Sequence, residues 1–136
     1  MKRLLLLFVL ALIIISCKKS SDDDPEPISI EKYKVTYSFT SLGLDTLEYI
    51  KYLDQNGNEI AVTDTNEYSY SFEQPKNNIH ARIIIKGSTG TLFTAFASYS
   101  LEVTDKNNGI IYIRESETDG PGINFTWNAE YKNIEN

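Results

Sequence analysis

Cys17 is the only cysteine among the 136 residues, so its thiol cannot form a disulfide within the chain. It follows a short basic start, Lys2 and Arg3, and an uninterrupted apolar run from Leu4 to Ile15. That run has the length of a signal-peptide hydrophobic region, whereas a helix needs roughly 20 apolar residues to span a bilayer. We therefore expect the Cys17 thiol to be an attachment point and not a redox group.

The four residues Ile14-Ile15-Ser16-Cys17 resemble the lipobox of bacterial lipoproteins, with a branched apolar residue, a small residue and then a cysteine. The resemblance implies that a signal peptidase removes residues 1–16 and that Cys17 carries a diacylglyceryl thioether and an N-acyl chain. Each buried CH₂ contributes about 0.8 kcal/mol, so two or three acyl chains hold a protein on a membrane durably. We expect a membrane attachment through this covalent lipid and no other cofactor.

Residues 17–30 are predicted to form a disordered tether, because polar, charged and proline residues dominate them. Within it, Ser21, Asp22, Asp23 and Asp24 resemble the acidic export signal that directs lipoproteins of Bacteroidota to the cell surface. A charge-repelled spacer is one alternative, and a calcium site, which needs about six to eight oxygen ligands, is another. The export signal implies an outer-membrane protein that faces the cell exterior, and a periplasm-facing anchor is the alternative.

The net charge excludes one class of partner. Removing Lys2 and Arg3 from the 13 basic residues leaves 11 against 19 acidic residues, a net charge of −8. Phosphate backbones are bound by basic surfaces, so we expect no nucleic-acid partner.

Residues 31–136 show the alternation of apolar and polar side chains that is typical of half-buried strands. The alternation predicts strands over 33–40, 46–53, 59–63, 68–72, 79–85, 92–104, 110–114 and 123–131. Residues rich in Gly, Asn, Asp and Pro predict turns or loops at 55–58, 75–78, 87–90, 106–109 and 118–122. About six to eight short strands with frequent turns predict an all-β protein with a single antiparallel β-sandwich, and a closed barrel is the alternative.

Aromatic spacing and one turn within residues 32–105 resemble the small β-sandwich of MmpS-type proteins. The segments that carry the resemblance are Tyr33-Lys34-Val35-Thr36-Tyr37, Ile50-Lys51-Tyr52, Asn56-Gly57-Asn58 and Tyr70-Ser71-Phe72. MmpS proteins assist transporters of the inner membrane, a context that this chain lacks, so the resemblance implies the fold and not the function.

No spacing in this chain points to catalysis. His80 is the only histidine, which excludes a multi-histidine metal site. It alternates onto the same strand face as Arg82, so we expect a partly exposed strand residue. A Ser-His-Asp triad is recognised by geometry and not by sequence order, but no Gly-x-Ser-x-Gly elbow is present. We expect no enzymatic activity and no metal.

The remaining candidates are binding residues. Nine tyrosines, six phenylalanines and one tryptophan make 12% of the chain, and we expect most of them to fill the core. We expect core packing for any one of the following seven, but all seven cannot face one core comfortably, and a subset on an exposed sheet face would stack on a sugar ring or anchor a protein: Tyr49, Tyr52, Tyr68, Tyr70, Tyr99, Tyr112 and Trp127. Asp45-Thr46-Leu47 resembles the O-glycosylation acceptor motif of Bacteroidota, which makes Thr46 a candidate modification site, and a plain strand start is the alternative.

Together these features predict a lipid-anchored envelope protein that acts as a non-catalytic binding or accessory module on the cell surface, with a protein or glycan ligand. The alternative is a structural or accessory subunit of an outer-membrane or periplasmic complex.

Overall fold

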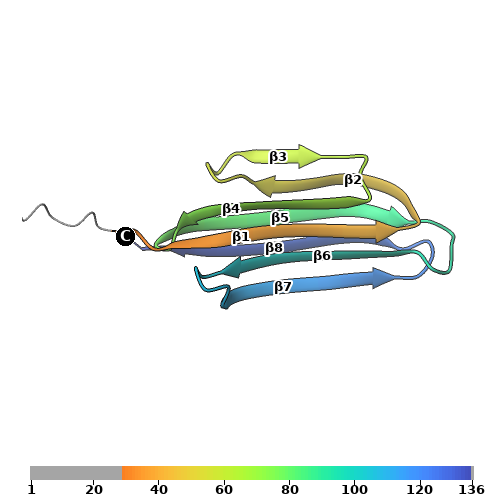
Figure 1. Ribbon diagram of the computed structural model, residues 1–136. Coiled ribbons are helices and arrows are strands. Elements are labelled where there is room, and N and C mark those ends of the chain that lie inside the picture. The colour runs from red at the N-terminus through yellow and green to blue at the C-terminus, as the bar shows by residue number, and fades with distance from the viewer. Residues whose placement is uncertain (1–28, 136) are drawn as a thin grey trace, which may run out of the picture.

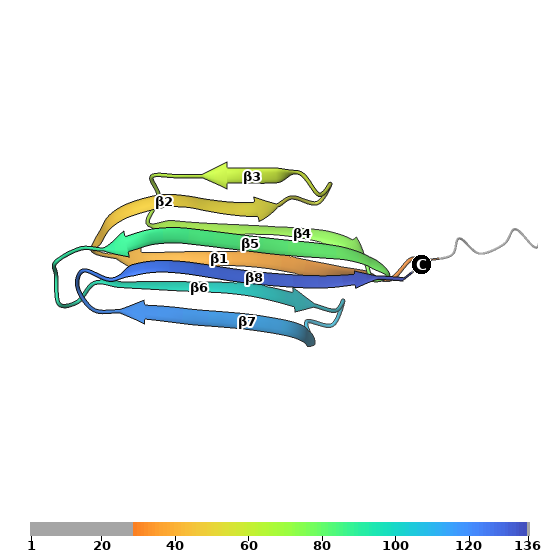
Figure 2. The same cartoon turned by 180° about the vertical axis from the view of Figure 1, so that it is seen from behind.

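Two antiparallel four-stranded sheets pack face to face as a β-sandwich (Figure 1 and Figure 2). The structure is a computed structural model that describes residues 29–135. The predicted signal peptide, Cys17 and the acidic residues Ser21 to Asp24 lie outside this part of the chain. The architecture confirms the predicted all-β class and the sandwich.

The strands of each sheet come from distant parts of the sequence. The first sheet has the order β4-β1-β6-β7. Its strands are β4 (Glu67–Pro75), β1 (Lys32–Leu42), β6 (Phe96–Thr104) and β7 (Ile110–Asp119). The second sheet has the order β3-β2-β5-β8. Its strands are β3 (Glu59–Val62), β2 (Leu44–Leu53), β5 (Asn78–Thr89) and β8 (Asn124–Ile134).

The core lies between the sheets, where alternate residues of each strand meet. Ile79, Ala81, Ile83 and Ile85 of β5 are all fully buried, as the alternation predicted. β1, at the centre of the other sheet, contributes Val35, Tyr37 and Phe39. Full burial of a large apolar side chain contributes about 1.5–3 kcal/mol, so these two central strands carry much of the stability.

Six of the seven aromatic residues that were considered for an exposed binding surface face this core. Tyr52, Tyr99 and Trp127 are buried, and Tyr68, Tyr70 and Tyr112 are half-buried residues that pack against the core from its margins. This agrees with the expectation that most aromatic residues fill the core and that the seven do not all face it. Tyr49 alone lies on the outer face, where the Lys51 ammonium sits 5.1 Å from its ring centroid.

In two hairpin turns an aspartate side chain accepts hydrogen bonds from the backbone in the same way. Both turns lie where the sequence predicted them. In the β2–β3 turn, Asp54 Oδ1 accepts hydrogen bonds from the backbone N–H groups of Asn56 (2.8 Å) and Asn58 (2.9 Å). In the β6–β7 turn, Asp105 Oδ1 accepts them from Asn107 (2.8 Å) and Gly109 (2.8 Å). An aspartate that binds the backbone a few residues ahead stabilises a tight turn and so sets the register of the hairpin.

The predicted turn at 87–90 was wrong. β5 continues to Thr89, because Gly87 and Ser88 pair with β8 on one side and with β2 on the other. Gly87 is needed within the strand, since a Cβ there would lie 2.6 Å from the carbonyl oxygen of Thr46. The glycine that suggested a turn instead permits a close approach between two strands.

Every strand differs from its prediction at one or both boundaries. β6 begins at Phe96 and not at Leu92, because the chain uses residues 90–95 to cross from the second sheet to the first. β7 extends beyond Arg114 to Asp119, and β8 begins at Asn124, one residue later than predicted.

The strands lie along the length of the molecule, so that the loops gather at two ends (Figure 1). The first described residues and the last lie at the same end, where Lys76 N–H binds the Glu31 carbonyl and Glu135 N–H binds that of Asn77. The β1–β2, β5–β6 and β7–β8 connections lie at the opposite end, which we call the distal end.

Candidate ligand-binding site

Four connections lie at the distal end, and three of them meet and form one surface. They are Gly43 between β1 and β2, residues 90–95 between β5 and β6, and residues 120–123 between β7 and β8. We call this surface the distal platform. Its three parts come from both sheets, so the sandwich itself positions them.

Thr89 ties two of these connections together. Its hydroxyl donates a hydrogen bond to the Gly120 carbonyl (2.7 Å) and accepts one from the Ile123 N–H (2.8 Å). Its own N–H binds the Ile123 carbonyl (2.9 Å). The side chain is only 2% exposed. A buried hydroxyl with both functions used holds its neighbours in one arrangement, because breaking either bond would leave a buried polar group without a partner.

Backbone hydrogen bonds through glycine complete the platform. Gly90 N–H binds the Gly43 carbonyl (2.7 Å), and Gly122 N–H binds the Gly90 carbonyl (2.8 Å). Gly43 has a φ of 65°, and a Cβ there would meet the Cβ of Ala95 at 3.3 Å. The single residue between β1 and β2 must therefore be small and able to adopt a left-handed conformation. The three connections are thus joined to one another as well as to the strands.

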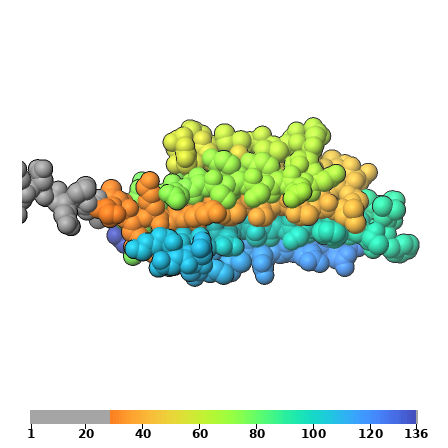
Figure 3. All heavy atoms as spheres, in the orientation of Figure 1, coloured from red at the N-terminus to blue at the C-terminus, as the bar shows by residue number. Residues whose placement is uncertain are grey.

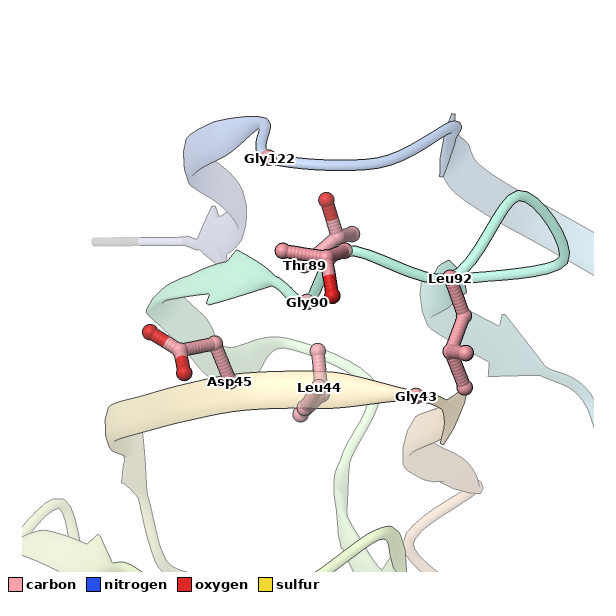
Figure 4. Close-up of a pocket in the computed structure, with 8 residues that line it drawn as sticks. Gly43, Leu44, Asp45, Thr89, Gly90, Leu92 and Gly122 are labelled. Atoms are coloured by element: carbon pink, nitrogen blue, oxygen red, sulfur yellow. The ribbon is translucent and has the colours of Figure 1, made fainter.

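The platform contains a pocket of about 400 Å³. Figure 4 shows Asp45 at one side, Leu92 at the other, Thr89 and Gly90 between them, and Gly122 on the facing connection. Asp45 is the only ionisable residue among the described residues that line it. The pocket therefore suits a neutral polar or cationic group, because a carboxylate and hydroxyls accept hydrogen bonds from such a group and repel an anion.

Large apolar side chains are exposed to solvent at the distal end, and one of them, Leu92, lines the pocket. Phe93 is 91% exposed, Leu92 61%, Leu42 54% and Ile123 38%. Phe93 is the only aromatic residue among those described that is classed as exposed. In Figure 3 the β5–β6 connection projects from the end of the molecule. An exposed apolar group beside a pocket is typical of an interaction site.

The tyrosine cluster at the margin of the core is not such a site. Tyr37, Tyr52, Tyr68, Tyr70 and Phe72 contact one another with ring centroids 5.0–6.5 Å apart. The Tyr37 hydroxyl donates to the Leu53 carbonyl at 2.9 Å. Burial raises the pKa values of Tyr37 and Tyr68 well above the ordinary tyrosine value. These rings are used by the core, so they offer no flat exposed face to a sugar.

The sequence-predicted site residues do not converge. Cys17 and Ser21 to Asp24 fall outside the described residues, so their roles remain predictions. Thr46 lies in β2, next to Asp45 at the pocket, and is exposed, with its hydroxyl 3.4 Å from the Asp45 carboxylate. Its glycosylation remains a prediction, and its position near the start of β2 agrees with the alternative of a plain strand start. His80 is partly exposed on the outer face of β5, as expected, with Nε2 2.8 Å from Glu130 Oε1.

Sequence reasoning missed Phe93. Alternation placed it on the buried face of a strand that begins at Leu92, whereas it lies in the connection before that strand. The signal that could have found it is the segment Thr91-Leu92-Phe93-Thr94. Two apolar residues stand next to each other there between two threonines, which breaks the period-two pattern of a half-buried strand.

No model of a known protein family matches the chain, and no curated protein matches it significantly. Across residues 29–135, no group of three or more His, Cys, Asp or Glu side chains converges. The described residues also contain no helix long and apolar enough to cross a membrane.

Proposed function

We propose that the protein is a lipid-anchored envelope protein that acts as a non-catalytic binding module on the cell surface and contacts a partner protein through its distal platform. One observation carries this proposal: β1 begins at the end of the sandwich opposite the platform (Figure 1). A chain held at Cys17 would present the platform away from the membrane.

The composition of the platform supports a protein partner. Hot spots of protein interfaces are aromatic or large residues at the centre of a patch that excludes water. Phe93 supplies such a residue, and Leu92, Leu42 and Ile123 supply the apolar surroundings. The Asp45 carboxylate, at the opposite side of the pocket from Leu92, would bind a lysine or arginine of the partner (Figure 4).

Preorganisation supports the same function. A binding surface made of mobile loops loses affinity because its loops must be ordered on binding. Here Thr89, Gly43 and Gly90 already join the three connections by hydrogen bonds. The platform therefore resembles a prepared surface and not a set of independent loops.

Photo-crosslinking in living cells tests this proposal. A photoreactive amino acid replaces Phe93 in the full-length chain, and a matched chain carries it at Lys132, an exposed residue on β8. The proposal predicts a discrete protein adduct from position 93 that is absent from position 132. Equal labelling at both positions, or none at either, would contradict it. An adduct at 93 that disappears after glycosidase treatment would assign the platform to a glycan instead.

The anchor and its orientation need a separate measurement. Labelling with a clickable fatty acid should mark the wild-type protein and not Cys17→Ala. Protease added to intact cells should degrade the wild-type protein, and full protection would place it on the periplasmic side. Replacing Asp22, Asp23 and Asp24 by alanine should retain the lipid and remove the protease sensitivity.

A further inference from the structure

β7 lies at the edge of the first sheet, and most of its residues are exposed to solvent. It pairs with β6 on one side only. Only Tyr112 and Thr118 of its residues are partly buried, and all the others are exposed. Ile110 is 61% exposed, Ile111 43% and Ile113 45%. An edge strand presents a row of N–H and C=O groups that a further strand can bind, and three exposed isoleucines add apolar surface to it.

The other edges are less suitable for a further strand. β3 has only four residues, and β4 ends in a proline, which lacks the N–H that pairing needs. β8 is long, but every outward-facing residue from Asn124 to Lys132 is polar. Among the edge strands of residues 29–135, β8 has one exposed large apolar side chain, Ile134, whereas β7 has three.

The outer face of β7 divides into an apolar half and an acidic half. Ile111 and Ile113 lie on this face, followed by Glu115 and Glu117. The two glutamates lie beside Ser98 around a hollow of about 290 Å³. Within residues 29–135, neither glutamate forms an ion pair, whereas the outer face of the second sheet holds three between glutamate and lysine or arginine. A partner strand would therefore meet uncompensated negative charge at one half of β7 and apolar surface at the other.

A second copy of the chain fits this pattern poorly. Antiparallel pairing of β7 with itself about a twofold axis keeps equivalent faces on the same side. The two registers that pair nearly the whole strand place Arg114 opposite Arg114, or Glu115 opposite Glu115. Both also place an isoleucine, Ile111 or Ile113, opposite Glu117. Like charges directly opposite each other destabilise a sheet, so the favoured occupant carries the opposite charge.

We propose that the β7 edge binds an extended segment of a partner protein that adds to the first sheet as a further strand. Its apolar side chains lie opposite Ile111 and Ile113, and its lysine or arginine side chains lie opposite Glu115 and Glu117. Main-chain hydrogen bonds give affinity, and the charge pattern selects the segment. This surface is separate from the distal platform, and the inference does not depend on the function proposed for that platform.

Two synthetic octapeptides test the inference on the full-length, isotope-labelled chain in detergent micelles. The first, Lys-Thr-Lys-Glu-Val-Thr-Val-Thr, complements β7 in the antiparallel direction, and the second exchanges its lysines for glutamates and its glutamate for lysine. The first peptide should shift the backbone amide resonances of β7 and slow their hydrogen exchange. Because three charge pairs change, those with Glu115, Glu117 and Arg114, it should bind roughly tenfold more tightly than the second.

A charge reversal in the protein shows whether the preference between the two peptides depends on Glu115 and Glu117. The variant Glu115→Lys/Glu117→Lys should prefer the second peptide, whereas the control Glu67→Lys/Glu73→Lys on the β4 edge should retain the wild-type preference. Equal binding of both peptides, no binding of either, or shifts confined to another strand would overturn the inference. Concentration-dependent shifts of β7 without peptide would assign the edge to a second copy and would also overturn it.

Discussion

The hydroxyl of Thr89 lies 2.7 Å from the carbonyl oxygen of Gly120, and this bond joins the end of β5 to the β7–β8 connection. Thr89→Val keeps the shape of the side chain but leaves the Gly120 carbonyl and the Ile123 N–H without their partner. We expect a loss of about 1–3 kcal/mol in the free energy of unfolding, because both groups are removed from water. Thr126→Val, at an exposed position on β8, should change it by less than about 0.5 kcal/mol. Urea unfolding of the full-length proteins measures both, and equal losses would show that Thr89 has no special role.

Alkaline pH should destabilise the fold through Tyr37. Burial raises the pKa of its phenol above the ordinary value of 10.0. The folded state therefore holds this proton more tightly than the unfolded state. The resulting stabilisation is complete below about pH 10 and falls as the pH rises further, by about 1.4 kcal/mol per pH unit for one such group.

Tyr37→Phe tests the origin of that slope. It removes the hydrogen bond to the Leu53 carbonyl and should lower stability at neutral pH by about 1–3 kcal/mol. It should also reduce the loss of stability between pH 10 and about pH 11.5, because the titrating group is gone. Tyr49→Phe, on the outer face, should leave the slope as in the wild type. An unchanged slope in Tyr37→Phe would show that other groups cause it.

The β2–β3 turn should weaken in acid through Asp54. Hydrogen bonds from the Asn58 and Asn56 backbone lower the pKa of its carboxyl below the ordinary value of 3.8. A lowered folded-state pKa stabilises the protein above that value, and this contribution is lost as the pH falls through the folded-state pKa. Asp54→Ala should lower the melting temperature at pH 7 and narrow its difference from the wild type near pH 2. A difference that stays constant down to that pH would rule out this role.

Gly87→Ala tests the close approach of β5 to β2. The added Cβ would lie 2.6 Å from the Thr46 carbonyl oxygen and 3.0 Å from the Phe125 ring. Because backbone and core must both shift, we expect a loss of about 1–3 kcal/mol on unfolding. Ser88→Ala, the neighbouring residue on the outer face, is the matched control and should be nearly neutral. Comparable melting temperatures for the two variants would contradict the packing that places Gly87 inside a strand.

The fold was predictable because its signals are local. Period-two alternation in β1 and β5 depends only on which face of a strand is buried. The two aspartate turns at Asp54 and Asp105 are likewise encoded within a few residues. Both kinds of signal survive without any knowledge of which strands become neighbours.

The distal platform was not predictable in the same way. Gly87 indicated a turn because nothing in its neighbourhood shows that Thr46 would approach it. Phe93 seemed to continue an alternating strand because the change of sheet after Thr89 is a property of the topology. The contacts of Thr89 with Gly120 and Ile123 join residues more than thirty positions apart. Such a site exists only after both sheets have formed.

The proposed role of the distal platform in holding a partner protein is tested by an affinity measurement. The full-length wild type, Phe93→Ala and Lys132→Ala are compared for binding to the protein captured by crosslinking at position 93. Truncating the central residue of such a site typically costs about 2 kcal/mol or more, a change of roughly 30-fold in Kd. We expect Phe93→Ala to weaken binding by at least that factor and Lys132→Ala to bind as the wild type does. Wild-type affinity in Phe93→Ala would contradict the account.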